Sequence, residues 1–449
     1  MASSKTPTKT SKQIKKSLPA KKTQPTRLAV AFSGGLDSAV LLHAAIQAHG
    51  PKNVYAFHVH HGIQKEANQW QKHCQKIAQQ WGCHFDTRNV HLQQASNIES
   101  QARELRYDAL YEMCESHQIE DLLVAHHLDD QAETVLIQLM RGAGLAGLSG
   151  MPAIKTSIKE RSKSKVIYVW RPFLEMRRQD LEAYAHLHRL KWIEDPSNQD
   201  ESYRRNAVRK TLLPQLEKVQ TGAIQNLARS AKHLAQSQEL LNQLADIDLG
   251  LIQTKAGLSK TNLVRLYKTS QARASNALRR WLQINHLAYP SEERLNAWWR
   301  DLSEVRVDTR LQWQHAGHVI KLWRGVLTIH PEERVVTDDE GSLGDWVFKT
   351  IPANSKKPGI PKERFNEAKK KGLINTMPRD GGEKLKLYPN RPRKSLKNLY
   401  QEANIPPWQR QVPLLYIGDE LVAVEGIGIS ADWQTDQGQR ISAEWLPNV

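Results

Sequence analysis

A short segment rich in serine and glycine, set between two apolar stretches, limits the folds open to this chain. Leu28 to Phe32 is an apolar run of the length expected for a buried parallel strand. Ala39 to Gln47 has the composition of a helix, and Ser33 to Ser38 lies between the two with the sequence Ser-Gly-Gly-Leu-Asp-Ser. This order predicts an α/β fold with a phosphate-binding turn, in which backbone N–H groups at the helix N-terminus hold an anion.

The residues of this turn suit a nucleotide. Gly34 and Gly35 let the backbone approach a phosphate and point its N–H groups inward. The hydroxyls of Ser33 and Ser38 can donate hydrogen bonds, and the carboxylate of Asp37 can hold a magnesium ion. A Walker loop would need Lys and then Ser or Thr after its last glycine, which this turn lacks. The pattern instead resembles the PP-loop of the N-type ATP pyrophosphatases, which release pyrophosphate and transfer AMP to a carbonyl oxygen; an ordinary serine-glycine turn is the alternative.

Predicted strands and helices alternate through the first half of the chain, which indicates a parallel, Rossmann-like sheet covered on both faces. The strands are Val54 to His60, Asp121 to Ala125 and Val166 to Arg171; the helices are Gln64 to Trp81, a long helix capped by Asn97, and Asp129 to Arg141. Lys155 to Lys165 is predicted to be a basic loop. We predict a disordered basic tail over residues 1–26, an α/β catalytic domain over 27–216, a mostly helical middle domain over 217–330, a linker over 331–374 and a small α+β domain over 375–449.

A group of acidic residues follows the strand predicted at 121–125. Asp129 and Glu133 are four residues apart and share a helix face, with Asp130 beside them. Carboxylates grouped in this way suit a magnesium ion or the ammonium groups of a lysine substrate. Acidic residues that merely stabilise a helix N-terminus are an equally good interpretation. His126 and His127 precede them, but no third ligand follows at zinc spacing, so a zinc site is not indicated.

Several motifs, taken in this order, resemble the tRNA(Ile)-lysidine synthetase family. The most specific is His126 to Thr134, His-His-Leu-Asp-Asp-Gln-Ala-Glu-Thr, followed by the glycine-rich Arg141 to Leu148. Others are His60 to Ile63, Glu99 to Tyr107, Arg171 to Leu174, Trp192 to Asn198, Tyr203 to Asn206 with Arg209, Asp380 to Glu383, Leu396 to Leu399, Gln401 with Glu402, and Pro406 to Trp408. Each motif alone could be packing or surface charge. The resemblance covers nearly everything from Arg27 onward except the Lys155 to Lys165 insert.

The resemblance implies a two-step reaction on RNA. The C2 carbonyl oxygen of the wobble cytidine in a CAU anticodon attacks the α-phosphate of ATP, and the amine of L-lysine then attacks C2 and displaces AMP. The product, lysidine, pairs with A rather than G, so this isoleucine tRNA reads AUA and accepts isoleucine instead of methionine. The middle and C-terminal domains are implied to bind the tRNA.

Site residues follow from the same resemblance. The implied catalytic residues are Asp37, Arg106, Asp130, Glu133 and Arg205. ATP is implied to contact Ser33, Gly34, Gly35, Leu36, Asp37, Ser38 and His60. Magnesium is implied at Asp37 and Asp129. Which carboxylate binds lysine rather than metal, and which group is the general base, stay open at this point.

The composition agrees with an RNA partner. There are 64 Lys and Arg residues against 47 Asp and Glu, a net charge of +17, and phosphates dominate the affinity of proteins for nucleic acid. Arg379 to Arg410 holds eight basic and three acidic residues, interleaved with Tyr388, Tyr400 and Trp408, a pattern that suits phosphate contacts and base stacking. Charge that only maintains solubility is the alternative.

Other features bear on location and assembly. No stretch approaches the ~20 apolar residues of a membrane span, so no membrane partner is expected. The three cysteines, Cys74, Cys83 and Cys114, form no disulfide framework, which favours a reducing, cytoplasmic location. A homodimer is among the oligomeric states that the sequence leaves open.

Three other functions compete with the lysidine hypothesis. A tRNA thiolase would need cysteines that carry sulfur or hold a cluster, and the three present are poorly placed for either role. A relative of the amidotransferase type would need a glutaminase unit or external ammonia, which the basic C-terminal regions do not suggest. A non-catalytic tRNA-binding protein would not need the intact turn or the acids at Asp129, Asp130 and Glu133.

Overall fold

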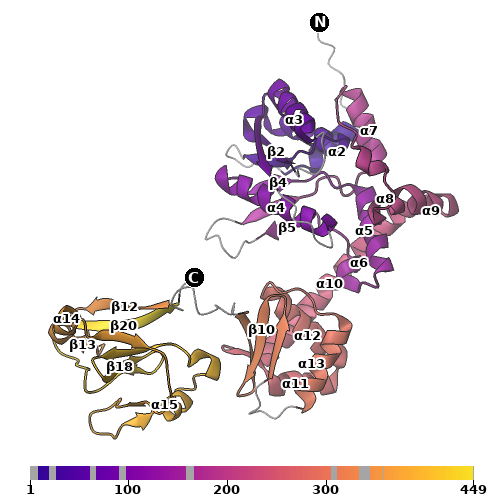
Figure 1. Cartoon of the computed structure of the whole chain (residues 1–449). Helices are drawn as coiled ribbons and strands as arrows, with labels where there is room; N and C mark the ends of the chain where they lie inside the picture. The colour runs from indigo at the N-terminus through magenta and orange to yellow at the C-terminus, as the bar shows by residue number, and fades with distance from the viewer. Residues whose placement is uncertain are drawn as a thin grey trace. The chain divides into compact units, whose positions relative to one another are not determined.

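A six-stranded sheet forms the centre of the first of two compact units, Met1–Ile247 and Asp248–Val449 (Figure 1). The computed structural model describes residues 9–19, 27–60, 67–90, 98–157, 166–304, 311–332, 344–355 and 357–447. The strand order is β3-β2-β1-β4-β6-β5, and only β5 runs antiparallel to its neighbour. The strands are β1 (Leu28–Ala31), β2 (Val54–His60), β3 (His84–Asn89), β4 (Asp121–Leu123), β5 (Ile154–Ser157) and β6 (Ile167–Trp170). The predicted parallel sheet is confirmed, whereas the loop predicted from Lys155 begins as strand β5.

Helices cover both faces of this sheet, as the apolar run of β1 requires, because its residues are buried on both sides. One face packs against α2 (Leu36–His49), α3 (Ala67–Trp81) and α7 (Arg178–Leu187). The other face packs against α4 (Ile98–Ser116), whose Leu110 and Met113 meet Ala29, Phe57 and Leu122. The unit continues with α5 (Leu128–Met140), α6 (Leu145–Leu148), α8 (Arg204–Ala207), a π-helical turn at Val208–Leu212, α9 (Leu213–Val219) and α10 (Ala223–Ile252), which runs past the unit's last residue.

The basic N-terminal segment contains a helix, α1 (Lys9–Ser17). Ile14 and Leu18 are 1% and 7% exposed and join the core formed with α2 and α7. The prediction of a disordered tail is therefore wrong for residues 9–19; residues 1–8 and 20–26 lie outside the described part. The charge count obscured two apolar residues four positions apart, which is the spacing of one helix face.

The middle region in the second unit is helical as predicted, but it also contains a sheet that was not predicted. Helices α11 (Lys260–Thr269), α12 (Gln271–Ile284) and α13 (Glu292–Glu304) share a core with the sheet through Trp281, Trp298 and Ile320. The sheet is antiparallel, with the order β7-β8-β11-β10-β9. Its strands are β7 (Gln253–Thr254), β8 (Gly257–Ser259), β9 (Leu311–His315), β10 (His318–Trp323) and β11 (Val326–Pro331).

The C-terminal region is an α+β fold, and it begins earlier than predicted. Strand β12 (Gly344–Ile351) pairs along its whole length with β20 (Arg440–Pro447), and β13 (Ile360–Pro361) joins them. The linker prediction over 331–374 is therefore wrong for Gly344–Ile351 and for residues 360–370, because the prolines of this segment lie at or beyond strand ends. Residues 333–343 lie outside the described part. The other elements are α14 (Lys362–Lys370), β14 (Ile374–Met377), β15 (Lys384–Leu385), β16 (Lys394–Ser395), α15 (Leu396–Glu402), β17 (Leu414–Ile417), β18 (Glu420–Val424) and β19 (Gly428–Ile429).

Within the described ranges, no helix has the length and apolar character needed to cross a membrane.

Candidate active site

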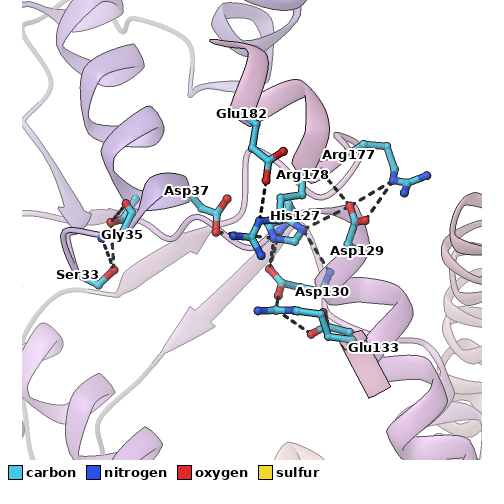
Figure 2. Close-up of polar contacts among 12 residues, drawn as sticks. Ser33, Gly35, Asp37, His127, Asp129, Asp130, Glu133, Arg177, Arg178 and Glu182 are labelled. Atoms are coloured by element: carbon cyan, nitrogen blue, oxygen red, sulfur yellow. Dashed lines mark hydrogen bonds and ion pairs between the residues drawn. The ribbon is translucent and has the colours of Figure 1, made fainter. Parts of the chain in front are cut away.

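The turn between β1 and α2 is held in shape by its own serines. Ser33 Oγ lies 3.1 Å from Ser38 Oγ, and the Ser38 hydroxyl donates to the carbonyl oxygen of Gly35 at 2.9 Å (Figure 2). Gly34 has a φ of 87°, and a Cβ there would lie 2.8 Å from Cys74 Sγ, so both conformation and space require glycine. Helix α2 follows Gly35, which has no side chain to cap it. Its first N–H groups therefore suit an anion.

His127 connects this turn to the acidic motif. Its Nδ1 accepts a hydrogen bond from the backbone N–H of Asp130 at 3.3 Å, and its own N–H donates to Asp130 Oδ2 at 3.0 Å, so His127 caps α5. Because Nδ1 is an acceptor, Nε2 carries the ring proton, and Nε2 lies 3.8 Å from Asp37 Oδ2 (Figure 2). His127 is 1% exposed. One buried ring thus lies between the phosphate-binding turn and the acids that follow β4.

Asp37 has one oxygen for which the described residues provide no hydrogen-bond donor. Burial raises the pKa of Asp37, although His127 and Arg178 act in the opposite direction. Asp37 Oδ1 is buried and accepts no hydrogen bond from the residues that the structure describes. A buried carboxylate oxygen in this state is stabilised by a cation or a donor supplied by a ligand. Asp37 therefore fits the role of a magnesium ligand, which the sequence predicted.

Asp130 and Glu133 form a compact cluster with two arginines. Asp130 Oδ1 accepts from the Nη2 atoms of Arg205 and Arg209, both at 3.1 Å. Glu133, which is fully buried, accepts from Arg205 Nε at 2.8 Å and from Arg209 Nε at 2.6 Å. Burial alone would raise the pKa of Asp130, but His127 and Arg205 hold it at about 2. Asp130 is therefore ionised at neutral pH, and the two arginines fix both side chains in position.

Asp129 is bound by the start of α7. Its carboxylate accepts from Arg177 Nε at 3.2 Å and from the backbone N–H of Arg178 at 2.9 Å (Figure 2). Two protein donors thus contact the carboxylate at which magnesium was predicted, and the magnesium role of Asp129 stays a prediction. Among the described residues, no group of three His, Cys, Asp or Glu side chains is arranged to hold a metal ion.

A cavity of about 240 Å³ lies beside these clusters. Charged residues of both signs line it, together with an apolar part formed by α9 and α10. The lining residues are His127, Asp129, Glu133, Arg177, Arg178, Arg209, Leu213, Pro214, Glu217 and Ile224. A small molecule with an apolar chain and groups of opposite charge matches this lining.

The two remaining predicted residues lie on neighbouring elements. Arg106 is on α4, where burial and the nearby charges of Arg103 and Arg205 lower its pKa, so it lies on the Arg205 side of the site. His60 ends β2, next to β1, and its Nε2 lies 3.1 Å from Asn68 Oδ1.

Three protein-family models, each of one domain, match successive parts of the chain. They are a PP-loop domain over residues 6–216, a TilS substrate binding domain over 262–328 and a TilS substrate C-terminal domain over 374–445. The tRNA(Ile)-lysidine synthase of Burkholderia mallei is 35% identical to this chain over an alignment 471 positions long, gaps included, and the alignment covers 94% of each chain. The tRNA(Ile)-lysidine synthases of Ralstonia nicotianae and Pseudomonas aeruginosa are each 36% identical to this chain. The alignments cover 94% and 93% of this chain, respectively, and 93% of each relative.

The chain belongs to the tRNA(Ile)-lysidine synthase family. This confirms the family that the motifs predicted. It also separates the chain from the thiolase and amidotransferase alternatives, because both TilS domains follow the PP-loop domain.

Sequence reasoning missed several residues of the site in this synthase-family chain. Arg177, Arg178 and Glu217 line the cavity, and Arg209 pairs with both buried carboxylates. Arg209 belonged to a recognised motif and lies four residues after Arg205, a spacing that could have identified it. The other three reach the site only through the packing of α7 and α9, which no local pattern shows.

Proposed function

We propose that this chain joins L-lysine to C2 of the wobble cytidine in a tRNA(Ile) with a CAU anticodon, consuming ATP and releasing AMP and pyrophosphate. The observation that carries the proposal is the position of His127 between Asp37 of the PP-loop and the Asp130–Glu133 cluster, beside a cavity of mixed charge. The product would decode AUA instead of AUG and give the tRNA isoleucine identity.

In the first step the cytidine C2 oxygen forms a bond to the α-phosphorus of ATP, and the bond from that phosphorus to the pyrophosphate oxygen breaks. Backbone N–H groups at the start of α2 and the hydroxyls of Ser33 and Ser38 suit the phosphates, and Arg106 suits the charge that develops on the α-phosphate. Magnesium, when bound at Asp37, would neutralise phosphate charge.

In the second step a lysine nitrogen bonds to C2, the bond from C2 to the adenylate oxygen breaks, and AMP leaves. Free lysine has a side-chain pKa of about 10.4, so the amine must lose a proton. The cavity offers Asp129 and Glu217 for an ammonium group and Arg177 and Arg178 for a carboxylate, which supports it as the lysine site. Arg205 and Arg209 fix Asp130 and Glu133 beside it.

Labelled lysine tests the proposal directly. The full chain is incubated with ATP, magnesium, radiolabelled L-lysine and a CAU tRNA(Ile) transcript, and a transcript with G in place of the wobble C serves as the control. Label in acid-precipitable RNA with the CAU transcript alone is expected. Pyrophosphate release without lysine label would point to another nucleophile, and neither signal would favour a non-catalytic tRNA-binding protein.

A further inference from the structure

A second group of polar side chains lies at the carboxyl end of β4, on the face of the sheet that α4 covers. Leu122 and Val124 pack into the core beneath α4, and His126 is two residues further along the same extended segment, so it projects to the same face. Arg103, Arg106 and Tyr107 come from α4, and Arg171 follows β6, the neighbour of β4.

Three buried polar atoms of this group have no hydrogen-bond partner in the part of the chain that the structure describes. They are Tyr107 Oη, His126 Nδ1 and Arg171 Nε. A buried polar atom without a partner is costly, and several in one place indicate that a ligand or water completes their hydrogen bonds. Tyr107 also lies beneath two guanidinium groups, those of Arg103 and Arg106, at 5.6 and 5.7 Å from its ring centre.

The charge of the group is strongly positive. Burial lowers the pKa of His126 to about 3, and Arg171, Arg205 and Arg103 contribute to the shift against the effect of Asp130. Asp130 is already paired with Arg205 and Arg209. The imidazole is therefore neutral at physiological pH, in a field set by arginines, and an anion with several oxygens would satisfy the group.

One member of this group reaches the surface of the first unit. Arg103 is exposed, whereas Arg171 is buried and Tyr107 and His126 are half-buried. A backbone phosphate can therefore approach Arg103 from outside.

We propose that Arg103, Arg171, His126 and Tyr107 bind a backbone phosphate of the RNA substrate next to the reacting cytidine. The inference rests on the proposed function only in taking RNA as the substrate. The phosphate holds the anticodon strand on the α4 side of the sheet, so that the base can reach the PP-loop. Such a contact also offsets the cost of moving the base out of its stack.

Salt-dependent RNA binding tests this site. The affinity of the full chain for a CAU tRNA(Ile) transcript is measured without ATP at salt concentrations from about 50 to about 300 mM. Over this range, the release of counterions from RNA changes the affinity measurably. The variants are Arg103→Gln, Arg103→Lys and, as a matched arginine control, Arg27→Gln at the exposed start of β1. Because Arg103 and Arg27 are both exposed, these changes spare the core.

Arg103→Gln is expected to weaken binding roughly tenfold and to reduce the slope of log K against log salt by about 0.7, the value for one single-strand phosphate contact. Arg103→Lys should keep most of the slope, and Arg27→Gln should match the unmodified chain. Equal slopes for Arg103→Gln and Arg27→Gln would overturn the proposal.

A modified RNA distinguishes the backbone phosphate from ATP. Neutral methylphosphonate linkages are placed one at a time on either side of the wobble cytidine of an anticodon stem-loop. One position is expected to weaken binding by the unmodified chain but not by Arg103→Gln, with the KM for ATP equal in both proteins. A raised KM for ATP with unchanged RNA affinity would assign the group to the nucleotide and overturn the proposal. Loss of ligation with the RNA coupling intact would instead refute only the proposed function.

Discussion

His127 Nε2 lies 3.8 Å from Asp37 Oδ2, while Nδ1 of the same ring accepts a hydrogen bond from the backbone of Asp130. The ring therefore lies between the first turn of α2 and the first turn of α5 and is hydrogen-bonded to the second. In the proposed function the first turn holds the nucleotide and the second positions the other substrate, so their spacing sets the geometry of transfer. Asn at position 127 could still cap α5 but would leave Asp37 without this neighbour.

His127→Asn is expected to keep the fold and to lose activity. We predict a fall in kcat/KM of about a hundredfold, since a misplaced active-site group commonly costs that much, with the unfolding temperature close to that of the unmodified chain. His127→Ala should lose both activity and stability, because it also removes the cap. Steady-state kinetics and thermal unfolding of the two variants check this; full activity in His127→Asn would contradict the positioning role.

Gly34→Ala is expected to weaken ATP binding. The added Cβ would meet Cys74 Sγ at 2.8 Å and would also strain a φ of 87°. Gly50→Ala is the matched control, because Gly50 has a φ of 85° but nothing within 4 Å of its Cβ position. Both should cost about 1 kcal/mol of stability through backbone strain, and only Gly34→Ala should raise the dissociation constant for ATP. Calorimetric titration with ATP distinguishes them.

Glu133→Gln is expected to destabilise the first unit. Two guanidinium groups would lose a fully buried partner, which should lower the free energy of unfolding by about 3 kcal/mol. This is the lower end of the range for a broken buried ion pair, because Arg205 and Arg209 are 27% and 29% exposed. Glu175→Gln breaks the exposed pair with Lys232 and should cost less than about 1 kcal/mol. Urea unfolding gives both values, and similar losses would show that the buried cluster adds nothing special.

Ile14→Ala is expected to release α1 from the core. Ile14 is 1% exposed, and truncating a buried isoleucine costs about 2–5 kcal/mol. Lys12→Gln, at an exposed position of the same helix, should be neutral. Limited proteolysis followed by mass spectrometry should show faster cleavage near α1 in Ile14→Ala alone.

The stability of the first unit should fall as the pH is lowered from about 6.5 towards 4. Burial, followed by the neighbouring His188, lowers the pKa of His43 to about 4 from its ordinary value of 6.5. Between these two pKa values the unfolded chain binds a proton at His43 that the folded chain does not. The stability associated with neutral His43 is therefore complete above about pH 6.5 and is lost as the pH falls below it. The unfolding temperature of His43→Gln should therefore depend less on pH over this range. An unchanged pH profile would assign the effect to other groups.

Parts of the site that lie within one local segment could be predicted from the sequence. Parts that form only when distant elements pack together could not. Ser33 to Ser38 and Asp130 with Glu133 could be predicted because each set lies within one strand-to-helix junction. His127 was considered as a metal ligand and as part of the family motif, but its contact with the start of α5 and its approach to Asp37 depend on two elements 90 residues apart in the chain. The helix at Ile14 was missed because lysines dominate its composition. Gly344–Ile351 was assigned to a linker because prolines follow it in the sequence, although its own residues are largely apolar.

The stoichiometry of products tests the central claim most directly. The unmodified chain is supplied with a CAU tRNA(Ile) transcript, L-lysine and ATP, and lysine incorporated into RNA is counted against AMP, ADP, pyrophosphate and phosphate in the same samples. The account predicts one AMP and one pyrophosphate for each lysine incorporated, and none of these products above background with the G-for-C wobble transcript. Formation of ADP and phosphate in proportion to lysine would contradict attack at the α-phosphate, and lysine-independent turnover with no labelled RNA would contradict the ligase itself.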